Sequence, residues 1–157
     1  MIKIGILGDI GSGKSYVAKQ FGYPVFNADN VVSKLYKKDK KVFKKLQKTL
    51  PKFIFSYPLN KSEIAKAILA NGRNLNKIIK IVHFEVRKKL ILFLKKNRNK
   101  KLVILDIPLL IENKINHKRD VLIFVQSKKS EINKRLKKRK NFNLKINKKF
   151  KNIQLPL

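Results

Sequence analysis

The sequence predicts an α/β fold in which helices cover both faces of a parallel sheet. Three short runs are apolar, β-prone and nearly free of charge, as buried parallel strands are: residues 2–7, 102–105 and 121–125. Between them lie segments whose apolar residues recur at three- and four-residue spacings, the periodicity of amphipathic helices. Because strands that alternate with helices are typical of β-α-β units, the two patterns together predict this class.

The remaining elements follow from the same patterns. A glycine-rich loop comes after the first strand, and a further short strand is expected at 23–26, before Asn27. Asn60, followed by Glu63 three positions later, forms a capping-box pattern that predicts a helix start. The helices are expected at residues 15–21, at 28–36 with the helical pattern continuing through 37–50, and at 60–69, 75–94, 127–138 and about 141–153.

A length of 157 residues suits one domain with a sizeable core. The expected strands gather near the two ends of the chain, so residues 1–36 and 100–157 should form the core of the domain. The helices of about 37–99 then form an insertion between the second and third strands. Since no linker or internal repeat is visible, residues 1–157 are predicted to be a single domain.

The charge balance is strongly basic, with 40 Lys and Arg residues against 9 Asp and Glu residues and a formal net charge of +31. Such a field attracts polyanions, including nucleic acids. Lysine outnumbers arginine, however, and the lysines are spread over every segment, as a compositional bias would produce. Nucleic acid is therefore not the expected main partner, and the basic surface is expected to help attract an anionic substrate.

Composition also indicates where in the cell the protein is expected. No apolar run approaches the roughly 18 residues that a membrane helix needs, and the N-terminus does not resemble a signal peptide. The absence of cysteine excludes disulfides and thiol chemistry. The expected location is the cytoplasm, without a membrane partner, and the sequence predicts no particular oligomeric state.

A phosphate-binding loop is the strongest motif in the chain. Residues 8–15 match G-x-x-x-x-G-K-[ST] in full, between a predicted strand and a predicted helix. Backbone N–H groups of such a loop point at phosphate oxygens, Lys14 would bridge the β- and γ-phosphates, and the Ser15 hydroxyl would bind Mg²⁺. This predicts a P-loop NTPase fold, a three-layer α/β/α sandwich that uses ATP and Mg²⁺. The nucleotide-binding residues expected are Gly8, Asp9, Ile10, Gly11, Ser12, Gly13, Lys14, Ser15 and Tyr16.

Carboxylates and arginines elsewhere suit phosphoryl transfer. Asp29 follows the second strand, at the edge where open α/β sheets bind ligands, and could take the proton of an attacking hydroxyl, cap the next helix, or both. Asp106 ends the third strand, where a carboxylate can hold Mg²⁺ through water. Arg135 and Arg139 share one helix face and suit the charge of a transferring phosphoryl group, although arginines are unsurprising in so basic a segment.

With these residues in place, the sequence resembles the dephospho-coenzyme A kinases over almost the whole chain. In that family the P-loop helix leads to a strand ending in Asp-Ala-Asp, so Asn27 replaces the first aspartate, and Phe84 stands where the family has proline. The family also continues beyond residues 154–157 into a further strand, an Asn-x-Gly turn and a closing helix. The matching blocks are residues 5–15, Phe26-Asn27-Ala28-Asp29, Ile81-Val82-His83 with Arg87, Asp106-Ile107-Pro108-Leu109-Leu110-Ile111-Glu112, and Arg135-Leu136-Lys137-Lys138-Arg139.

The resemblance implies transfer of the ATP γ-phosphoryl group to the ribose 3′-hydroxyl of dephospho-CoA, the last step of coenzyme A synthesis. It implies catalytic roles for Asp29, Lys14 and two arginines of a closing lid helix, Arg135 and Arg139, with Ser15 and Asp106 at the metal. The implied acceptor-binding residues, some of them on the helical insertion, are Asp29, His83, Arg87, Pro108, Leu109 and Glu112.

Two alternatives stay open at this point. One is another P-loop kinase, acting on a nucleoside, a nucleotide or another small molecule. The other is a non-catalytic basic protein that binds nucleotides or nucleic acid. The chain is short for most motor ATPases and transporters, and it lacks the Asn-Lys-x-Asp signature of guanine-binding proteins.

Overall fold

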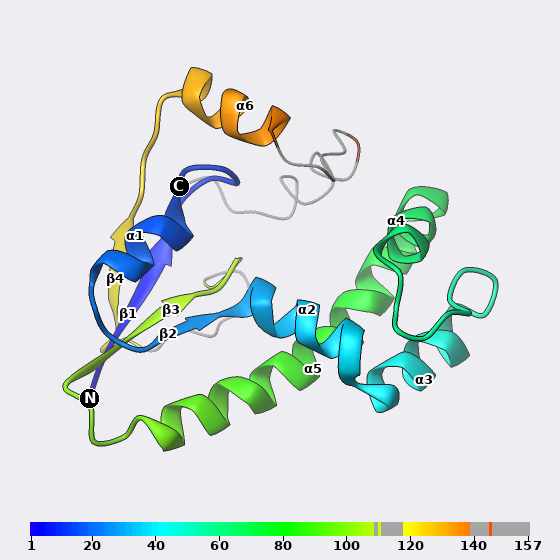
Figure 1. Cartoon of the computed structure of the whole chain (residues 1–157), viewed down its shortest axis with the longest axis horizontal. Helices are drawn as coiled ribbons and strands as arrows, with labels where there is room; N and C mark the ends of the chain where they lie inside the picture. The colour runs from blue at the N-terminus through cyan, green and yellow to red at the C-terminus, as the bar shows by residue number, and fades with distance from the viewer. Residues whose placement is uncertain (109, 111–117, 139–144, 146–157) are drawn as a thin grey trace. The chain divides into compact units, whose positions relative to one another are not determined.

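The computed structural model of the protein describes residues 1–108, 110, 118–138 and 145 (Figure 1). The chain divides into two compact units, one comprising residues 1–28 and 93–157 and the other residues 29–92. No helix in the described part of the chain is long and apolar enough to cross a membrane. The elements in chain order are β1 (Ile2–Leu7), α1 (Lys14–Gln20), β2 (Val25–Asn27), α2 (Ala28–Lys38), α3 (Lys40–Thr49), α4 (Lys61–Ala70), α5 (Gly72–Lys96), β3 (Leu102–Asp106), β4 (Val121–Phe124) and α6 (Lys129–Lys137).

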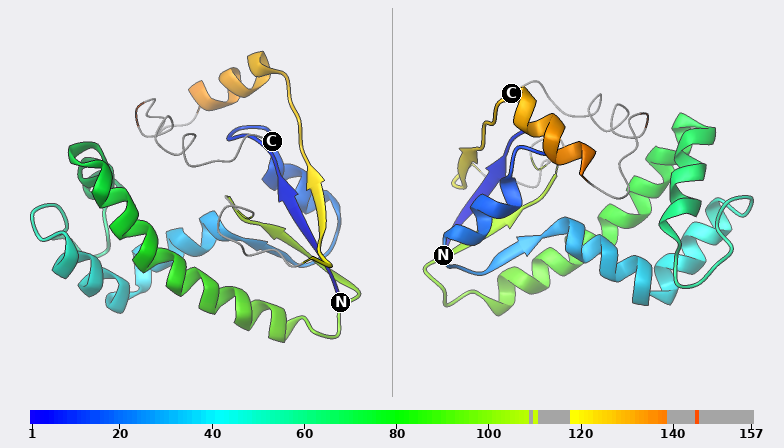
Figure 2. Two further views of the ribbon diagram at one scale, coloured as in Figure 1. Left: turned by 180° about the vertical axis from the view of Figure 1, so that it is seen from behind. Right: turned by 45° about the horizontal axis from the view of Figure 1, so that its top comes forward.

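The first unit is built on a parallel sheet of four strands in the order β2-β3-β1-β4 (Figure 1). All four strands run in the same direction, so their carboxyl ends meet at one edge of the sheet. α1 packs against β1, β2 and β3 (Figure 2). The predicted α/β class with a parallel sheet flanked by helices is therefore confirmed, with β2 placed one to two residues later than the pattern indicated.

The core of this unit explains why the apolar runs become strands. Ile4, Ile6 and Ile104 are buried in the centre of the sheet, and Ala18 packs against them from α1. β-branched side chains such as isoleucine favour the pleated backbone and fill the space between sheet and helix. Lys3, the one charge of β1, forms an ion pair of 3.0 Å with Asp120. Partly buried residues around this core are Phe21, Val25, Leu102, Ile123 and Val125.

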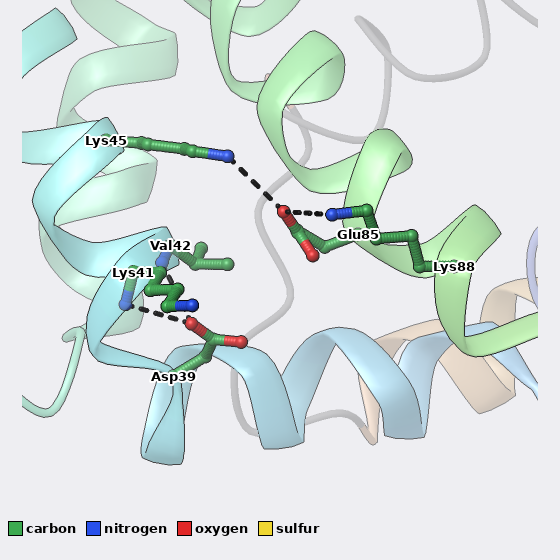
Figure 3. A network of polar contacts seen from close by, with 6 residues as sticks. All are labelled: Asp39, Lys41, Val42, Lys45, Glu85 and Lys88. Atoms are coloured by element: carbon green, nitrogen blue, oxygen red, sulfur yellow. Dashed lines mark hydrogen bonds and ion pairs between the residues drawn. The ribbon is translucent and has the colours of Figure 1, made fainter. Parts of the chain in front are cut away.

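The second unit consists of α2, α3, α4 and most of α5. The predicted continuous helix over residues 37–50 is wrong, because the chain leaves the helical conformation at Asp39. The Asp39 carboxylate accepts hydrogen bonds from the backbone N–H groups of Lys41 and Val42, at 2.9 and 3.0 Å, and so caps α3 (Figure 3). Aspartate is among the preferred residues for that position. The buried apolar residues of this unit include Leu35, Val42, Leu46, Leu50, Ile54, Ile64, Ile68, Leu75, Ile78 and Val82.

The start of α4 differs in one respect from a capping box. Asn60 caps the helix as expected, since its side chain accepts a hydrogen bond of 2.9 Å from the backbone N–H of Ser62. The buried carboxylate of Glu63 instead accepts hydrogen bonds from the backbone N–H groups of Phe55 and Ser56 and from the Ser56 hydroxyl. Glu63 thus joins α4 to the connector that precedes it.

Candidate active site

The P-loop follows the carboxyl end of β1 and leads directly into α1. Gly8, Gly11 and Gly13 have φ angles of 135°, 91° and 102°, a region of backbone conformation that residues with a side chain rarely adopt. At Gly8 a Cβ atom would also lie 2.3 Å from the backbone carbonyl oxygen of Val125. These positions therefore require glycine, which explains the spacing of the motif in physical terms.

Lys14 is the first residue of α1, and its side chain turns back over the loop. The ammonium group donates hydrogen bonds to the carbonyl oxygens of Gly8 at 2.7 Å and Asp9 at 2.8 Å. The loop therefore holds a positive charge at its own opening, where phosphate oxygens would bind. The side chain of Tyr16, in the first turn of the helix, is 70% exposed.

Ser15 and Asp106 lie beside the P-loop and share one hydrogen-bond donor. The Asn27 side-chain nitrogen lies 2.5 Å from Oδ2 of Asp106 and 3.4 Å from Oγ of Ser15. Asn27 and Asp106 are register partners at the carboxyl ends of β2 and β3. A hydroxyl and a carboxylate oxygen are the ligands that Mg²⁺ prefers, so these two residues fit such an ion together with substrate phosphates and water. The described residues contain no group of three or more His, Cys, Asp or Glu side chains suited to a metal.

Helix α6 contacts the outer side of the P-loop through its side chains. Arg135 donates hydrogen bonds to the carbonyl oxygens of Ser12, at 3.1 Å, and Gly11, at 3.4 Å. The Ser127 hydroxyl, just before α6, donates to the same Ser12 carbonyl at 2.7 Å and lies 3.4 Å from Arg135. A methyl group added at Gly11 would lie 3.2 Å from the side chains of Ile132 and Leu136, so the helix and the loop are closely packed.

The side-chain hydroxyl of Ser12 is a further feature of the P-loop. It is buried, with 3% of its surface exposed, and its hydroxyl has no hydrogen-bond partner among the residues that the structure describes. A buried polar atom normally has a partner, because leaving one unpaired costs about 1 to 3 kcal/mol. A hydroxyl in this position suits a phosphate oxygen as its partner.

The other expected site residues lie in several elements. Asp29 is an exposed residue in the first turn of α2, two residues after β2 ends, so it is inside the helix and does not precede it as a cap would. Pro108 is exposed in the turn after β3. His83, half-buried, and Arg87, exposed, lie one turn apart on α5 in the second unit. Leu109, Glu112 and Arg139 lie outside the described residues, as does the helix expected over 141–153 except for Lys145.

Sequence reasoning missed two participants in this arrangement. Asn27 stands out in the sequence only as a departure from a family pattern, and Ser127 does not stand out at all. Asn27 ends β2, and Ser127 follows β4. Because β2 lies beside β3 and β4 beside β1 in a parallel sheet, both residues come to the same edge of the sheet. The signal that could have found them is therefore a polar residue at the end of an apolar run, as for Asn27, or within two residues of it, as for Ser127.

A complete P-loop between a parallel strand and a helix, with a carboxylate at the end of the neighbouring strand, defines a P-loop nucleotide-binding protein. The family model of dephospho-CoA kinase matches residues 2–156 of the chain. The chain therefore belongs to the dephospho-CoA kinase family.

Individual relatives agree with this assignment. A dephospho-CoA kinase of Wolbachia sp. subsp. Brugia malayi is 33% identical over 98% of this chain and 81% of its own length. The dephospho-CoA kinase of Wolbachia pipientis wMel is 36% identical over 79% of this chain and 66% of its own length. That of Zymomonas mobilis is also 36% identical, over 71% of this chain and 58% of its own length. The crystal structure of TT1252 from Thermus thermophilus superposes with a TM-score of 0.74 and 28% identity, covering 99% of this chain and 81% of that one.

Proposed function

We propose that the chain transfers the γ-phosphoryl group of ATP to the ribose 3′-hydroxyl of dephospho-CoA, giving CoA and ADP. The observation that carries this proposal is the common position of Ser15 and Asp106 beside a complete P-loop, in a chain of the dephospho-CoA kinase family. Because ATP is the phosphoryl donor, we also propose that the reaction takes place in the cytoplasm.

The reaction forms one bond and breaks one. The 3′-oxygen of the ribose attacks the γ-phosphorus, and the bond from that phosphorus to the β–γ bridging oxygen breaks, so that ADP leaves. The hydroxyl proton passes to the carboxylate of Asp29 and then to solvent. Asp29 suits this role because it is exposed in the first turn of α2, two residues after β2 ends.

Cationic groups offset the charge of the nucleotide. Lys14 exchanges its contacts with the carbonyl groups of Gly8 and Asp9 for β- and γ-phosphate oxygens. Ser15 and Asp106 would hold Mg²⁺, and the bound ion would supply positive charge to offset the charge that develops on the phosphate oxygens. The chain's own task at this position is to present two oxygen ligands already close together.

The remaining expected residues have proposed roles at the lid and the acceptor. Arg135 keeps α6 on the P-loop, and with Arg139 it supplies permanent positive charge to the transferring phosphoryl group. His83 and Arg87 lie on one face of α5 and offer an imidazole and a permanently charged guanidinium group for the pyrophosphate of the acceptor. Pro108, Leu109 and Glu112 follow Asp106 and complete the acceptor site.

A coupled ADP-release assay with Mg·ATP tests the proposal. Release is expected with dephospho-CoA and not without it, and Lys14→Ala is expected to lower kcat/KM by about a hundredfold or more, because it removes a cation from the phosphate site. Lys19→Ala, at the exposed end of the same helix, is the matched control and should change little. ADP release with nucleosides but not with dephospho-CoA would contradict the proposal, and so would salt-sensitive RNA binding without any turnover.

A further inference from the structure

Asn27 lies between the two groups expected to hold a metal ion. Its amide nitrogen is within hydrogen-bond distance of Asp106 Oδ2, at 2.5 Å, and 3.4 Å from Ser15 Oγ. An ionised carboxylate can only accept hydrogen bonds, so the NH₂ group of the amide, and not its oxygen, must face Asp106. The chemistry of the contact therefore fixes the orientation of the Asn27 side chain.

The hydrogen bond from Asn27 matters to Asp106 because Asp106 is buried. That carboxylate belongs to a residue only 3% exposed, and buried polar atoms are normally hydrogen-bonded. The register of β2 and β3 pairs Asn27 with Asp106, so the backbone holds the two side chains opposite each other. The amide thus restricts the direction in which Asp106 presents its oxygens.

The neutrality of the amide is the second part of the argument. An aspartate in place of Asn27 would put two carboxylates within hydrogen-bond distance, and such a pair attracts a divalent cation without help from a ligand. Asparagine leaves a single carboxylate and one hydroxyl. Because Mg²⁺ demands octahedral oxygen coordination and gives up water reluctantly, two protein ligands bind it weakly unless phosphate oxygens are also present.

We propose that Asn27 is a positioning residue that holds Asp106 and Ser15 together as metal ligands and makes cation binding depend on the phosphates of the nucleotide. The metal then arrives with ATP and does not occupy the site beforehand. The proposal rests on the proposed function in one respect, namely that the nucleotide bound by the chain is ATP. Its tests use no dephospho-CoA, so failure of either idea can be recognised separately.

The positioning role is tested by calorimetric titration of the full chain with ATP, once with Mg²⁺ and once with EDTA. Asn27→Ala is expected to weaken binding of Mg·ATP by about tenfold, the effect of one charge-assisted hydrogen bond, and to change binding of metal-free ATP by less than about twofold. Equal losses under both conditions, or no loss with Mg²⁺, would overturn the proposal. A thermal unfolding scan of each variant shows that the comparison is made between folded proteins.

The charge argument is tested with Mn²⁺ alone, followed through the spectroscopic signal of the free ion. Asn27→Asp is expected to bind Mn²⁺ without nucleotide at least about tenfold more tightly than the unaltered chain, because a second carboxylate joins the site. Asn99→Asp, which adds the same charge at an exposed turn, is the control and should bind as the unaltered chain does. If the unaltered chain binds Mn²⁺ as tightly as Asn27→Asp, or if Asn99→Asp gives the same gain, the proposal is wrong.

Discussion

At the scale of single residues, the proposed mechanism assigns each task of phosphoryl transfer to a different side chain. Lys14 places a cation at the opening of the P-loop, while Ser15 and Asp106 present neighbouring oxygens beside it. Asp29 lies in the first turn of α2, the helix that follows β2. The division of tasks among different side chains means that each can be altered separately and produces a different kinetic signature.

Asp29→Asn is expected to lower kcat by about 10² to 10⁴, the usual contribution of a general base, with little change in the KM for ATP. The amide keeps the shape of the carboxylate but cannot take the proton of the attacking hydroxyl. Steady-state kinetics with both substrates varied measure the two parameters. A variant that kept its kcat in a demonstrably folded protein would show that Asp29 does not accept the proton.

The P-loop and its lysine could be predicted from the sequence because the motif is local, and its spacing follows from backbone geometry at Gly8, Gly11 and Gly13. Asn27 could not, because its role depends on strand pairing with Asp106, which is 79 positions away. Spacing along the chain carries no information about such a contact unless the strand order is known.

At the scale of elements, α6 and the residues just before it are connected to the P-loop through the carbonyl groups of Ser12 and Gly11. Ser127 and Arg135 both donate to the carbonyl oxygen of Ser12, and Ile132 and Leu136 pack beside Gly11. The loop that binds phosphate is therefore held from its outer side by the segment that follows β4. This contact explains how a short glycine-rich loop keeps a defined conformation.

Ser127→Ala is expected to raise the KM for ATP by about fivefold, the equivalent of one neutral hydrogen bond, with a smaller effect on kcat. Ser127→Thr, which keeps the hydroxyl, should restore the KM. Ser130→Ala, in the exposed first turn of α6, is the matched control. Equal KM values for Ser127→Ala and the control, measured by ATP titration, would show that the hydroxyl does not position the loop.

The connector before α4 depends on a single carboxylate. Burial alone raises the pKa of Glu63, but hydrogen bonds from the Ser56 hydroxyl and from the Phe55 and Ser56 amides, together with the charge of Lys66, outweigh burial and leave the pKa below its ordinary value of 4.5. A carboxyl group with a lowered pKa in the folded state stabilises the fold above its unfolded-state pKa. That contribution is lost as the pH falls through the folded-state pKa.

Glu63→Gln is therefore expected to lower the free energy of unfolding at pH 7 by about 1 to 3 kcal/mol. The difference from the unaltered chain should shrink as the pH falls below 4.5, because the carboxyl group of the unaltered chain then becomes protonated. Urea unfolding at several pH values between neutral and acid measures both quantities. A difference that stayed constant across this range would contradict the linkage.

Element boundaries were predictable where a change of pattern marks them. The apolar run at β1 ends before a glycine and that at β3 ends at an aspartate, so the bounds of β1 agree with prediction and those of β3 differ by one residue. The break at Asp39 was missed because the apolar spacing continues from α2 into α3 across the capping residue. Hydrophobic periodicity reports which face is buried and gives no sign of a one-residue interruption.

At the scale of the whole molecule, charge is the dominant property. The formal net charge is +31, and the four ion pairs given by the described residues involve few of the lysines. At Glu85, two lysines share one carboxylate, Lys45 at 3.3 Å and Lys88 at 3.8 Å (Figure 3). So large an excess of like charge repels itself and destabilises the compact state.

Raising the ionic strength from about 0.02 to about 0.3 M is expected to increase the Tm, because the screening length shortens below the spacing of the surface charges. The same change should weaken ATP binding, since the general attraction of the protein for anions is screened as well. Thermal scans and ATP titrations in sodium chloride measure the two opposite trends. A Tm that fell with salt would show that the excess charge does not limit stability.

The most direct test of the account is to identify the bond that the full chain makes. After incubation with Mg·ATP and dephospho-CoA, phosphorus NMR of the product should show a new 3′-phosphomonoester on the ribose, formed in equal amount to ADP and much more slowly with Lys14→Ala. ADP formation without that phosphomonoester, or a phosphoryl group on a different acceptor, would contradict the assignment of this P-loop site to dephospho-CoA.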